Sequence, residues 1–368
     1  MNYLEKPMKI IIDDKIPYIR GEVERLADEV VYLPGNKISA EDVREADALV
    51  VRTRTLCNRQ LLEGSRVGFI VTATIGYDHL DTAYLREAGI PWTNCPGCNA
   101  TSVAQYVRNS LLEAERDGIV RLSEATLGIV GYGHVGKAVY AALRPYVKEI
   151  LVNDPPLEVE SLKLKVECYA SGEGDNRRSV AKQLSTFNFQ LSTLEALQAS
   201  CDIITLHTPL TTDGPYPTWH LVDEPRLRAM RKRPVIVNAA RGGVVDEEAL
   251  EWALDKGLVR QAIIDTWEDE PHVRRSLLQK VFIGTPHIAG YSADGKANAT
   301  RMALEALARW KGERLMGKGE GITFDIRPAE AGPERTGLRY SPKSDSEALK
   351  RAPEAFERQR GNYPLRRE

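Results

Sequence analysis

The sequence has few cysteines, no excess of either charge and no long apolar run. Five cysteines are scattered over 368 residues, an odd number unlike a disulfide framework. The 50 basic and 52 acidic residues nearly cancel, so no sequence-wide field favours nucleic acid or an anionic membrane. The first residues, MNYLEKPMKIIIDD, lack the apolar stretch of an export signal. We therefore expect a cytoplasmic protein that binds a small molecule, with no nucleic-acid or membrane partner.

Short apolar runs alternate with helical patterns from about residue 9 to residue 290. This alternation is typical of parallel sheets covered by helices on both faces, so we predict an α/β protein with two doubly wound domains. The runs fall into two groups on either side of an amphipathic helix expected at residues 101–116. The predicted strands are residues 9–12, 48–51, 68–72 and 90–93 in the first group, and 126–130, 150–153, 202–206, 235–238, 262–265 and 281–284 in the second.

A glycine-rich turn follows the first strand of the second group. Its sequence, GYGHVG, has the GxGxxG spacing and opens a helical pattern. In dinucleotide-binding sheets these glycines permit a tight turn, the approach of the pyrophosphate and close packing of helix on strand. An acid ending the next strand would accept hydrogen bonds from ribose hydroxyls, and the Pro-Pro pair after it favours NAD over NADP. The predicted NAD-binding residues are Gly131, Gly133, His134, Val135, Gly136 and Asp154.

Three polar residues, Arg241, Glu270 and His287, each follow a predicted strand of the second group. The carboxyl ends of parallel strands meet at one edge of a sheet, so these side chains are expected in one crevice. Oxidation of a 2-hydroxy acid needs a cation for the carboxylate and a base for the hydroxyl proton. A guanidinium binds a carboxylate through two parallel hydrogen bonds, and a carboxylate beside imidazole helps the ring to carry a proton. We therefore predict Arg241 as the cation, His287 as the base and Glu270 as its partner.

The segments around these residues, NAARGGVVDEEAL, DTWEDEP and TPHIAGYS, resemble the signature segments of D-2-hydroxyacid dehydrogenases. The resemblance implies the same three catalytic roles and a Rossmann NAD-binding domain at residues 101–287. It also implies a flavodoxin-like substrate domain at residues 1–100, to which residues 288–312 return, with the active site between the domains. Residues 313–368 would form a C-terminal dimerisation segment, so a homodimer is expected.

Further segments resemble the branch of this family that oxidises a phosphorylated hydroxy acid, 4-phospho-D-erythronate, in vitamin B6 synthesis. They include KIIIDDKIPY, TATIGYDHLD, LHTPLTTDGPYPTWHL and RGNYPLRRE. By this resemblance Thr53, Thr74 and Tyr291 contact the substrate. Arg52 and Arg54 flank Thr53 and would add cationic donors suited to a phosphate. The resemblance adds three residues to the NAD site: Thr208, Asp265 and Gly290.

Three features depart from that branch. Gln105 stands where a glutamate is expected, residues 157–191 resemble an insertion of unknown role, and the C-terminal segment is shorter than in longer members. The geometry of the dimer is therefore open. Two other functions also stay open: action on another acid such as 3-phosphoglycerate, and an NAD-sensing interaction protein.

Other residues with reactive side chains are given structural roles. Cys95 and Cys98 form a CxxC pair before a helix, but neither a thioredoxin-like context nor a second Cys or His pair accompanies them. We predict a packed, reduced pair and no metal site. His207 and His220 are expected to be structural or at the substrate edge, and His79 and His272 to be solvated.

Overall fold

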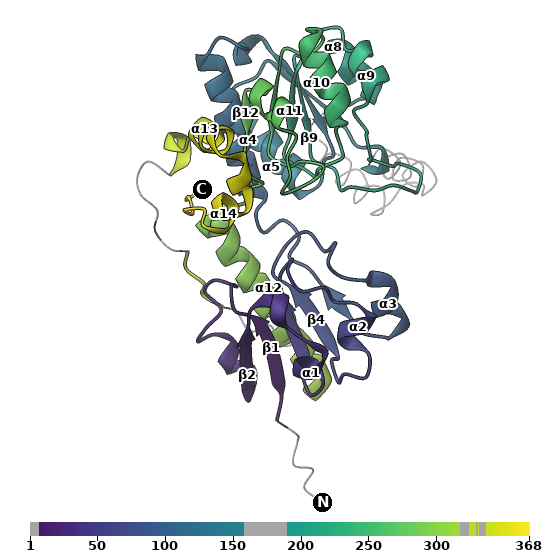
Figure 1. The fold of residues 1–368 in the computed structure, drawn as a ribbon, viewed down its shortest axis with the longest axis vertical. Coiled ribbons are helices and arrows are strands. Elements are labelled where there is room, and N and C mark those ends of the chain that lie inside the picture. The colour runs from purple at the N-terminus through teal and green to yellow at the C-terminus, as the bar shows by residue number, and fades with distance from the viewer. Residues whose placement is uncertain (1–6, 158–189, 317–323, 329, 331–335) are drawn as a thin grey trace, which may run out of the picture. The chain divides into compact units, whose positions relative to one another are not determined.

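The computed structural model describes residues 7–157, 190–316, 324–328, 330 and 336–368. The chain divides into two compact units (Figure 1). The first unit contains Met1–Asn99, Ser292–Ala331 and Arg367, and the second contains Ala100–Tyr291, Gly332–Arg366 and Glu368. The chain thus returns to the first unit at Ser292, where the sequence predicted residue 288. The predicted separate segment, residues 313–368, is divided between the two units.

The first unit contains a five-stranded parallel sheet with the order β2-β1-β3-β4-β5. This order is that of flavodoxin-like folds. Four of the strands confirm sequence predictions, whereas the edge strand β2 was missed. The bounds are β1 Lys9–Asp13, β2 Glu29–Leu33, β3 Ala48–Val51, β4 Phe69–Thr72 and β5 Trp92–Thr93.

Successive residues of a strand point to opposite sides of the sheet, and here the residues on both sides are buried. Helices therefore cover both faces of this sheet. Ile10, Val50 and Val71 face the long helix α12, Ala293–Met316, which returns from the far end of the sequence (Figure 1). Ile11 and Leu49 face the short helices on the other side. Those helices are α1 Ala40–Val43, α2 Arg59–Leu62 and α3 Thr82–Glu87, and two single turns, η1 Val23–Arg25 and η2 Gly35–Lys37, complete this part.

The second unit contains a seven-stranded parallel sheet with the order β12-β11-β10-β9-β6-β7-β8. Its central strands follow the dinucleotide-binding order, and all six predicted strands are confirmed. The seventh, β8, follows residues 158–189, so most of the predicted insertion at 157–191 lies outside the described residues. The bounds are β6 Thr126–Val130, β7 Glu149–Asn153, β8 Gln190–Leu191, β9 Ile203–Leu206, β10 Val235–Asn238, β11 Gln261–Ile264 and β12 Ile283–Gly284.

Helices cover both faces of this second sheet. On one face lie α4, which begins one residue before its predicted start, and α5. Val103, Val107 and Leu111 form the buried stripe of α4, and each such side chain contributes about 1.5–3 kcal/mol by burial. The helices are α4 Ala100–Arg116, α5 His134–Leu143, α8 Leu194–Ser200, α9 Glu224–Ala229, α10 Glu247–Asp255 and α11 Arg275–Lys280, with a turn η3 at Leu122–Glu124.

Most of the C-terminal segment, Gly332–Arg366, belongs to the second unit. Its helix α13 lies beside β12 and α4, as Figure 1 shows in yellow. Leu349 and Phe356 are buried in the same core as Leu277 of α11. This segment is therefore part of the domain that carries the second sheet. Its elements are η5 Gly337–Arg339, α13 Pro342–Arg351, η6 Pro353–Ala355 and α14 Phe356–Gly361.

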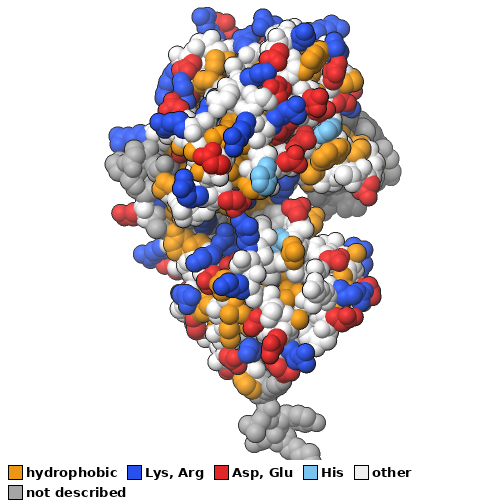
Figure 2. Space-filling model, in the orientation of Figure 1, with side chains coloured by type: hydrophobic (Ala, Val, Ile, Leu, Met, Phe, Trp, Pro, Cys, Tyr) orange, Lys and Arg blue, Asp and Glu red, His pale blue; other side chains and the backbone are white. Residues whose placement is uncertain are grey.

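Charge is mixed on the molecular surface. Among the described side chains on the face shown in Figure 2, Lys and Arg are interspersed with Asp and Glu. Within the described part of the chain, no helix combines the length and apolar character that a membrane span requires.

Candidate active site

The glycine-rich turn between β6 and α5 has the geometry predicted for a pyrophosphate site. Gly131 has φ +89°, and a Cβ there would lie 2.7 Å from the carbonyl oxygen of His207. A Cβ on Gly136 would overlap the carbonyl oxygen of Gly131, so this glycine lets helix and strand pack. A Cβ on Gly133 would meet nothing within 4 Å. Packing thus explains the first and third glycines, and the second leaves open space where a ligand would approach the backbone.

The residues around this turn also suit NAD. Helix α5 begins without a side-chain cap, so the first amides, including those of the exposed His134 and of Val135, point toward a prospective anion. Asp154 accepts from the Tyr132 amide at 2.7 Å through Oδ2, which ties its carboxylate to the turn. The buried Thr208 hydroxyl has no hydrogen-bond partner among the described residues. An unsatisfied hydroxyl beside an uncapped helix and an open glycine is consistent with a cofactor that supplies the missing contacts.

The two glycines give a matched prediction. We expect Gly133→Ala to unfold like the wild type but to bind NAD about 5- to 150-fold more weakly, since an intruding methyl costs about 1–3 kcal/mol. We expect Gly136→Ala to lower the free energy of unfolding by about 1–3 kcal/mol, because its Cβ meets backbone. Denaturant unfolding and NAD titration of both variants test this. Wild-type NAD affinity in Gly133→Ala would contradict the assignment.

His287 and Glu270 form a hydrogen-bonded pair. The Nδ1 atom of His287 lies 3.0 Å from Oε1 and 2.8 Å from Oε2 of Glu270. The Trp267 amide donates to Glu270 Oε1 at 3.0 Å and orients the carboxylate. Burial raises the pKa of Glu270, but the hydrogen bonds and charge of His287, the Trp267 amide and the charge of Arg360 together outweigh it, so the pKa lies below its usual value. With Nδ1 engaged by an ionised carboxylate, Nε2 is the nitrogen left to exchange a proton with substrate.

The backbone that carries His287 is strained and firmly held. His287 has φ +55°, in the left-handed region that few non-glycine residues adopt. The carboxylate of Asp265, which follows β11, accepts from the Ile288 amide at 2.8 Å, the Ala289 amide at 2.9 Å and the Thr285 hydroxyl at 2.6 Å. Burial raises the pKa of Asp265. In the described structure Asp265 fixes the loop of residues 287–291, and the NAD contact predicted for it stays a prediction.

Arg241 lies at the same edge of the sheet. It follows β10, which pairs with β11, and β11 pairs with β12 before His287. Its Nη1 donates to the Ala240 carbonyl at 2.9 Å. The side-chain amide of Asn238, through Nδ2, donates to the Arg241 carbonyl at 3.0 Å. The guanidinium is half-buried and anchored close to its own backbone.

Arg366, from the C-terminal segment, was not predicted to be functional. It is fully buried and donates five hydrogen bonds, which uses every N–H of a guanidinium. Three acceptors are backbone carbonyls of the loop that follows His287, at Ile288, Ala289 and Tyr291. The others are the Ser102 carbonyl and Gln105 Oε1. Gln105, noted above as a departure, is thus an acceptor for Arg366.

A second C-terminal arginine, Arg360, reaches the Glu270–His287 pair. Its Nη1 lies 3.5 Å from Glu270 Oε2, and its Nε donates to the Tyr291 hydroxyl at 3.2 Å. Sequence reasoning missed it because α14 reads as a charged surface helix, FERQRG. Tyr291 itself, predicted to contact substrate, is held by this contact, and Gly290 lies in the same loop.

In the first unit, the predicted substrate residues Thr53 and Thr74 follow β3 and β4. Thr53 is exposed, whereas the Thr74 hydroxyl donates to the Gly76 carbonyl at 2.8 Å and bonds with Thr72 at 2.7 Å. His79 continues this chain, with Nε2 3.0 Å from the Thr72 hydroxyl. The prediction that His79 is solvated is wrong: the ring is buried, which lowers its pKa to about 4 and keeps it neutral.

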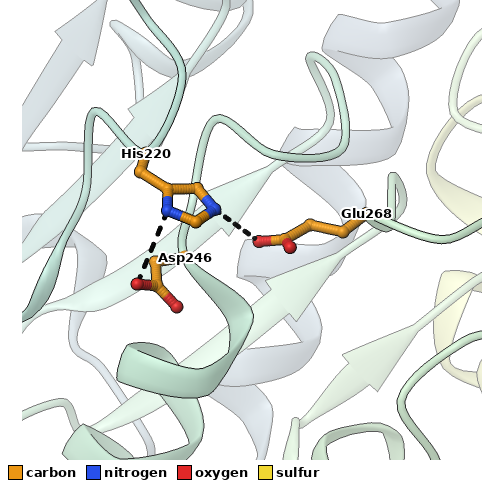
Figure 3. A group of neighbouring side chains, drawn as sticks. All are labelled: His220, Asp246 and Glu268. Carbon is orange, nitrogen blue, oxygen red and sulfur yellow. Dashed lines mark hydrogen bonds and ion pairs between the residues drawn. The ribbon is translucent and has the colours of Figure 1, made fainter.

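The contacts of His220 favour a structural role, one of the two alternatives left open for it. Figure 3 shows its ring between two carboxylates: Nε2 lies 3.1 Å from Glu268 Oε1 and Nδ1 3.6 Å from Asp246 Oδ2. Among the described residues, this group has ligand atoms within 4.8 Å of one another, as a metal site would. Each ring nitrogen already faces a carboxylate, so we interpret the group as a structural contact between three segments of the chain. The Trp219 ring stacks on His220 at 4.5 Å.

Cys95 and Cys98 are both buried in the core of the first unit. The Cys95 thiol contacts the carbonyls of Thr72 and Ala299 at 3.4 and 3.2 Å. Burial raises the pKa of Cys95 well above its usual value, which disfavours the reactive thiolate.

The site in the second unit combines a pyrophosphate turn, an anchored arginine and a carboxylate–histidine pair. Residues 99–289 match the family described as "D-isomer specific 2-hydroxyacid dehydrogenase, NAD binding domain". The chain belongs to this family of NAD-dependent dehydrogenases. Within the family, its relatives over nearly the full length of the chain include erythronate-4-phosphate dehydrogenases. The one from Bacteroides thetaiotaomicron is 46% identical over 98% of this chain and 97% of its own, and that from Porphyromonas gingivalis is 39% identical over 98% and 94%.

Solved structures agree on the fold. TT0316 protein from Thermus thermophilus superposes with a TM-score of 0.62 at 25% identity, over 82% of this chain and 95% of its own. D-Lactate dehydrogenase from Aquifex aeolicus, solved with NAD and lactic acid, gives 0.62 at 21% identity, over 87% of this chain and 100% of its own.

Proposed function

We propose that this chain oxidises 4-phospho-D-erythronate to (3R)-3-hydroxy-2-oxo-4-phosphobutanoate, with NAD as hydride acceptor, in pyridoxal 5′-phosphate biosynthesis. The observation that carries the proposal is the Glu270–His287 pair at the sheet edge that bears Arg241, in a chain whose full-length relatives bear that enzyme name. The chemistry that NAD supplies when bound is acceptance of the hydride from C2.

The residues of this chain perform the remaining steps. Arg241 binds the substrate carboxylate and polarises the C2 oxygen. His287 Nε2 accepts the hydroxyl proton as the C2–H bond breaks, so that C2–OH becomes C2=O and the imidazole becomes imidazolium. The Glu270 carboxylate at Nδ1 stabilises that imidazolium. The turn at Gly131, Gly133, His134, Val135 and Gly136 holds the pyrophosphate, and further NAD contacts come from Asp154, Thr208, Asp265 and Gly290.

The rest of the substrate is assigned to Thr53, Thr74 and Tyr291, with basic residues of the first unit for the phosphate. Arg52 donates to the Lys15 carbonyl at 2.8 Å, which orders its side chain. Burial, and the nearby charge of Arg52, lower the pKa of Lys296 to about 8. A dianionic phosphate would offset this crowding of cations, which supports a phosphorylated substrate. We also propose a cytoplasmic location and a homodimer.

The experiment is NADH fluorescence after the protein is mixed with NAD and 4-phosphoerythronate, beside 3-phosphoglycerate and D-lactate. We expect efficient turnover of the first acid alone. Preference for 3-phosphoglycerate would move the assignment to another dehydrogenase of the family. NAD binding without turnover of any of the three acids would instead favour the NAD-sensing role.

A further inference from the structure

Glu270 is a buried carboxylate whose partner changes charge during the reaction. Its side chain is 18% exposed, and His287 accounts for its closest contacts. In the oxidation proposed above, His287 must be neutral before it accepts the substrate proton. At that stage the ring no longer offsets the carboxylate charge, and burial, which favours protonation of Glu270, is opposed by the Trp267 amide and by the charge of Arg360.

Arg360 provides a permanent cation at this position. Its Nη1 is 3.5 Å from Glu270 Oε2, the same oxygen that lies 2.8 Å from His287 Nδ1. The side chain is only 22% exposed, so solvent screens the interaction weakly. Among the described residues, the charged and titratable groups that face Arg360 include Glu270 from the loop after β11, Tyr291 from the loop after β12, and Glu357 at 3.9 Å on α14.

The shape of the guanidinium matters as well as its charge. While Nη1 faces Glu270, Nε donates to the Tyr291 hydroxyl at 3.2 Å. A planar fork spans two acceptors in fixed directions, whereas a lysine ammonium is a single point charge. One side chain therefore links the partner of the catalytic base with a residue assigned to substrate.

We propose that Arg360 is a positioning residue for the reaction: it keeps Glu270 ionised toward His287 and orients Tyr291 toward the substrate. The C-terminal segment thereby takes part in catalysis as well as in packing. This inference rests on the proposed function for the role of Tyr291, whereas the contact with Glu270 stands on the geometry alone.

Three variants test the proposal by separating charge from shape: Arg360→Met, Arg360→Lys and the control Arg358→Met, which removes an exposed arginine of the same helix. We expect Arg360→Met to shift the acid limb of kcat/KM for 4-phosphoerythronate oxidation to higher pH by about one unit, which is roughly a tenfold loss below that limb. The sign follows because removal of the cation favours the protonated imidazole, and oxidation needs the neutral one. Both Arg360→Met and Arg360→Lys should raise KM, because neither side chain can donate to the Tyr291 hydroxyl as the guanidinium does. Arg360→Lys keeps the positive charge, so its pH profile should stay near that of the wild type.

A second measurement does not depend on turnover. The pH midpoint of the His287 ring signal in nitrogen NMR, assigned with His287→Gln, should move upward in Arg360→Met and stay near the wild-type value in Arg358→Met. An unmoved ring signal would overturn the proposal. So would a pH-independent loss of activity accompanied by a lower Tm, which would show a purely structural role. If the wild type oxidises none of the three acids, the proposed function fails while the ring signal still tests the contact with Glu270.

Discussion

Replacement of His287 by alanine is expected to lower kcat for oxidation by about 10²–10⁴-fold, the usual contribution of a positioned general base. The variant loses the nitrogen that accepts the hydroxyl proton, and Glu270 then faces an empty position. NAD affinity should stay near that of the wild type, because the pyrophosphate turn lies after β6 and is formed by other residues. Steady-state kinetics and NAD titration measure the two effects separately.

His272→Ala is the matched control, since His272 is exposed and lies two residues after Glu270. It should retain wild-type kcat. The kcat of Glu270→Gln should lie between those of His287→Ala and His272→Ala, because an amide can still orient the ring but cannot offset the imidazolium charge. Equal activity of His287→Ala and His272→Ala would remove His287 from the mechanism.

Replacement of Arg366 by methionine is expected to have the largest effect on stability. The guanidinium is fully buried, and its loss removes all five hydrogen bonds that it donates. Hydrogen bonds that involve a charged group contribute about 1.5–3 kcal/mol each, so loss of this set should lower the free energy of unfolding by several kcal/mol. Guanidinium stacking on the Tyr340 ring, with 4.5 Å between Arg366 Cζ and the ring centroid, is lost as well. Thermal and denaturant unfolding of the variant measure the loss.

Arg367→Met serves as the control for this variant. Its side chain is 33% exposed and donates to Asp294 at 2.8 Å, so its loss should cost about 1 kcal/mol or less. Comparable losses in the two variants would show that burial of Arg366 is not what stabilises the domain. Because three acceptors of Arg366 belong to the loop after His287, the surviving folded Arg366→Met protein should also have reduced kcat.

Sequence reasoning was most successful where a single physical rule determines the structure. The apolar runs at β6 and β10 had the predicted bounds, since a buried parallel strand must be apolar throughout. The edge strand β2, EVVYL, was missed because it has one neighbouring strand and its residues are only half-buried or exposed. Glu270 and His287 are paired as predicted, because the ends of neighbouring parallel strands meet.

The C-terminal contribution to the site could not have been predicted in this way. Arginine is almost never fully buried, so the ending RGNYPLRRE indicates an exposed tail on composition alone. Nothing local distinguishes Arg366 from Arg367, although one is buried and the other is a third exposed. Their difference depends on contacts with residues at distant positions in the sequence, such as Gln105. His79 was misjudged for a different reason: its partner Thr72 is close in the sequence, but it lies at the end of a buried strand, and the ring is buried with it.

Arg366 donates to three carbonyls of the loop after His287, and this contact has a consequence for the order of events during synthesis of the protein. Tyr291 and Arg366 are 75 positions apart. At about 5–20 residues per second, the ribosome needs roughly 4–15 s to make the chain between them. During that interval the loop after β12 has been made, but its carbonyls have no guanidinium to bind. The second sheet can form early, whereas the catalytic loop can reach its final geometry only after residue 366 has left the ribosome.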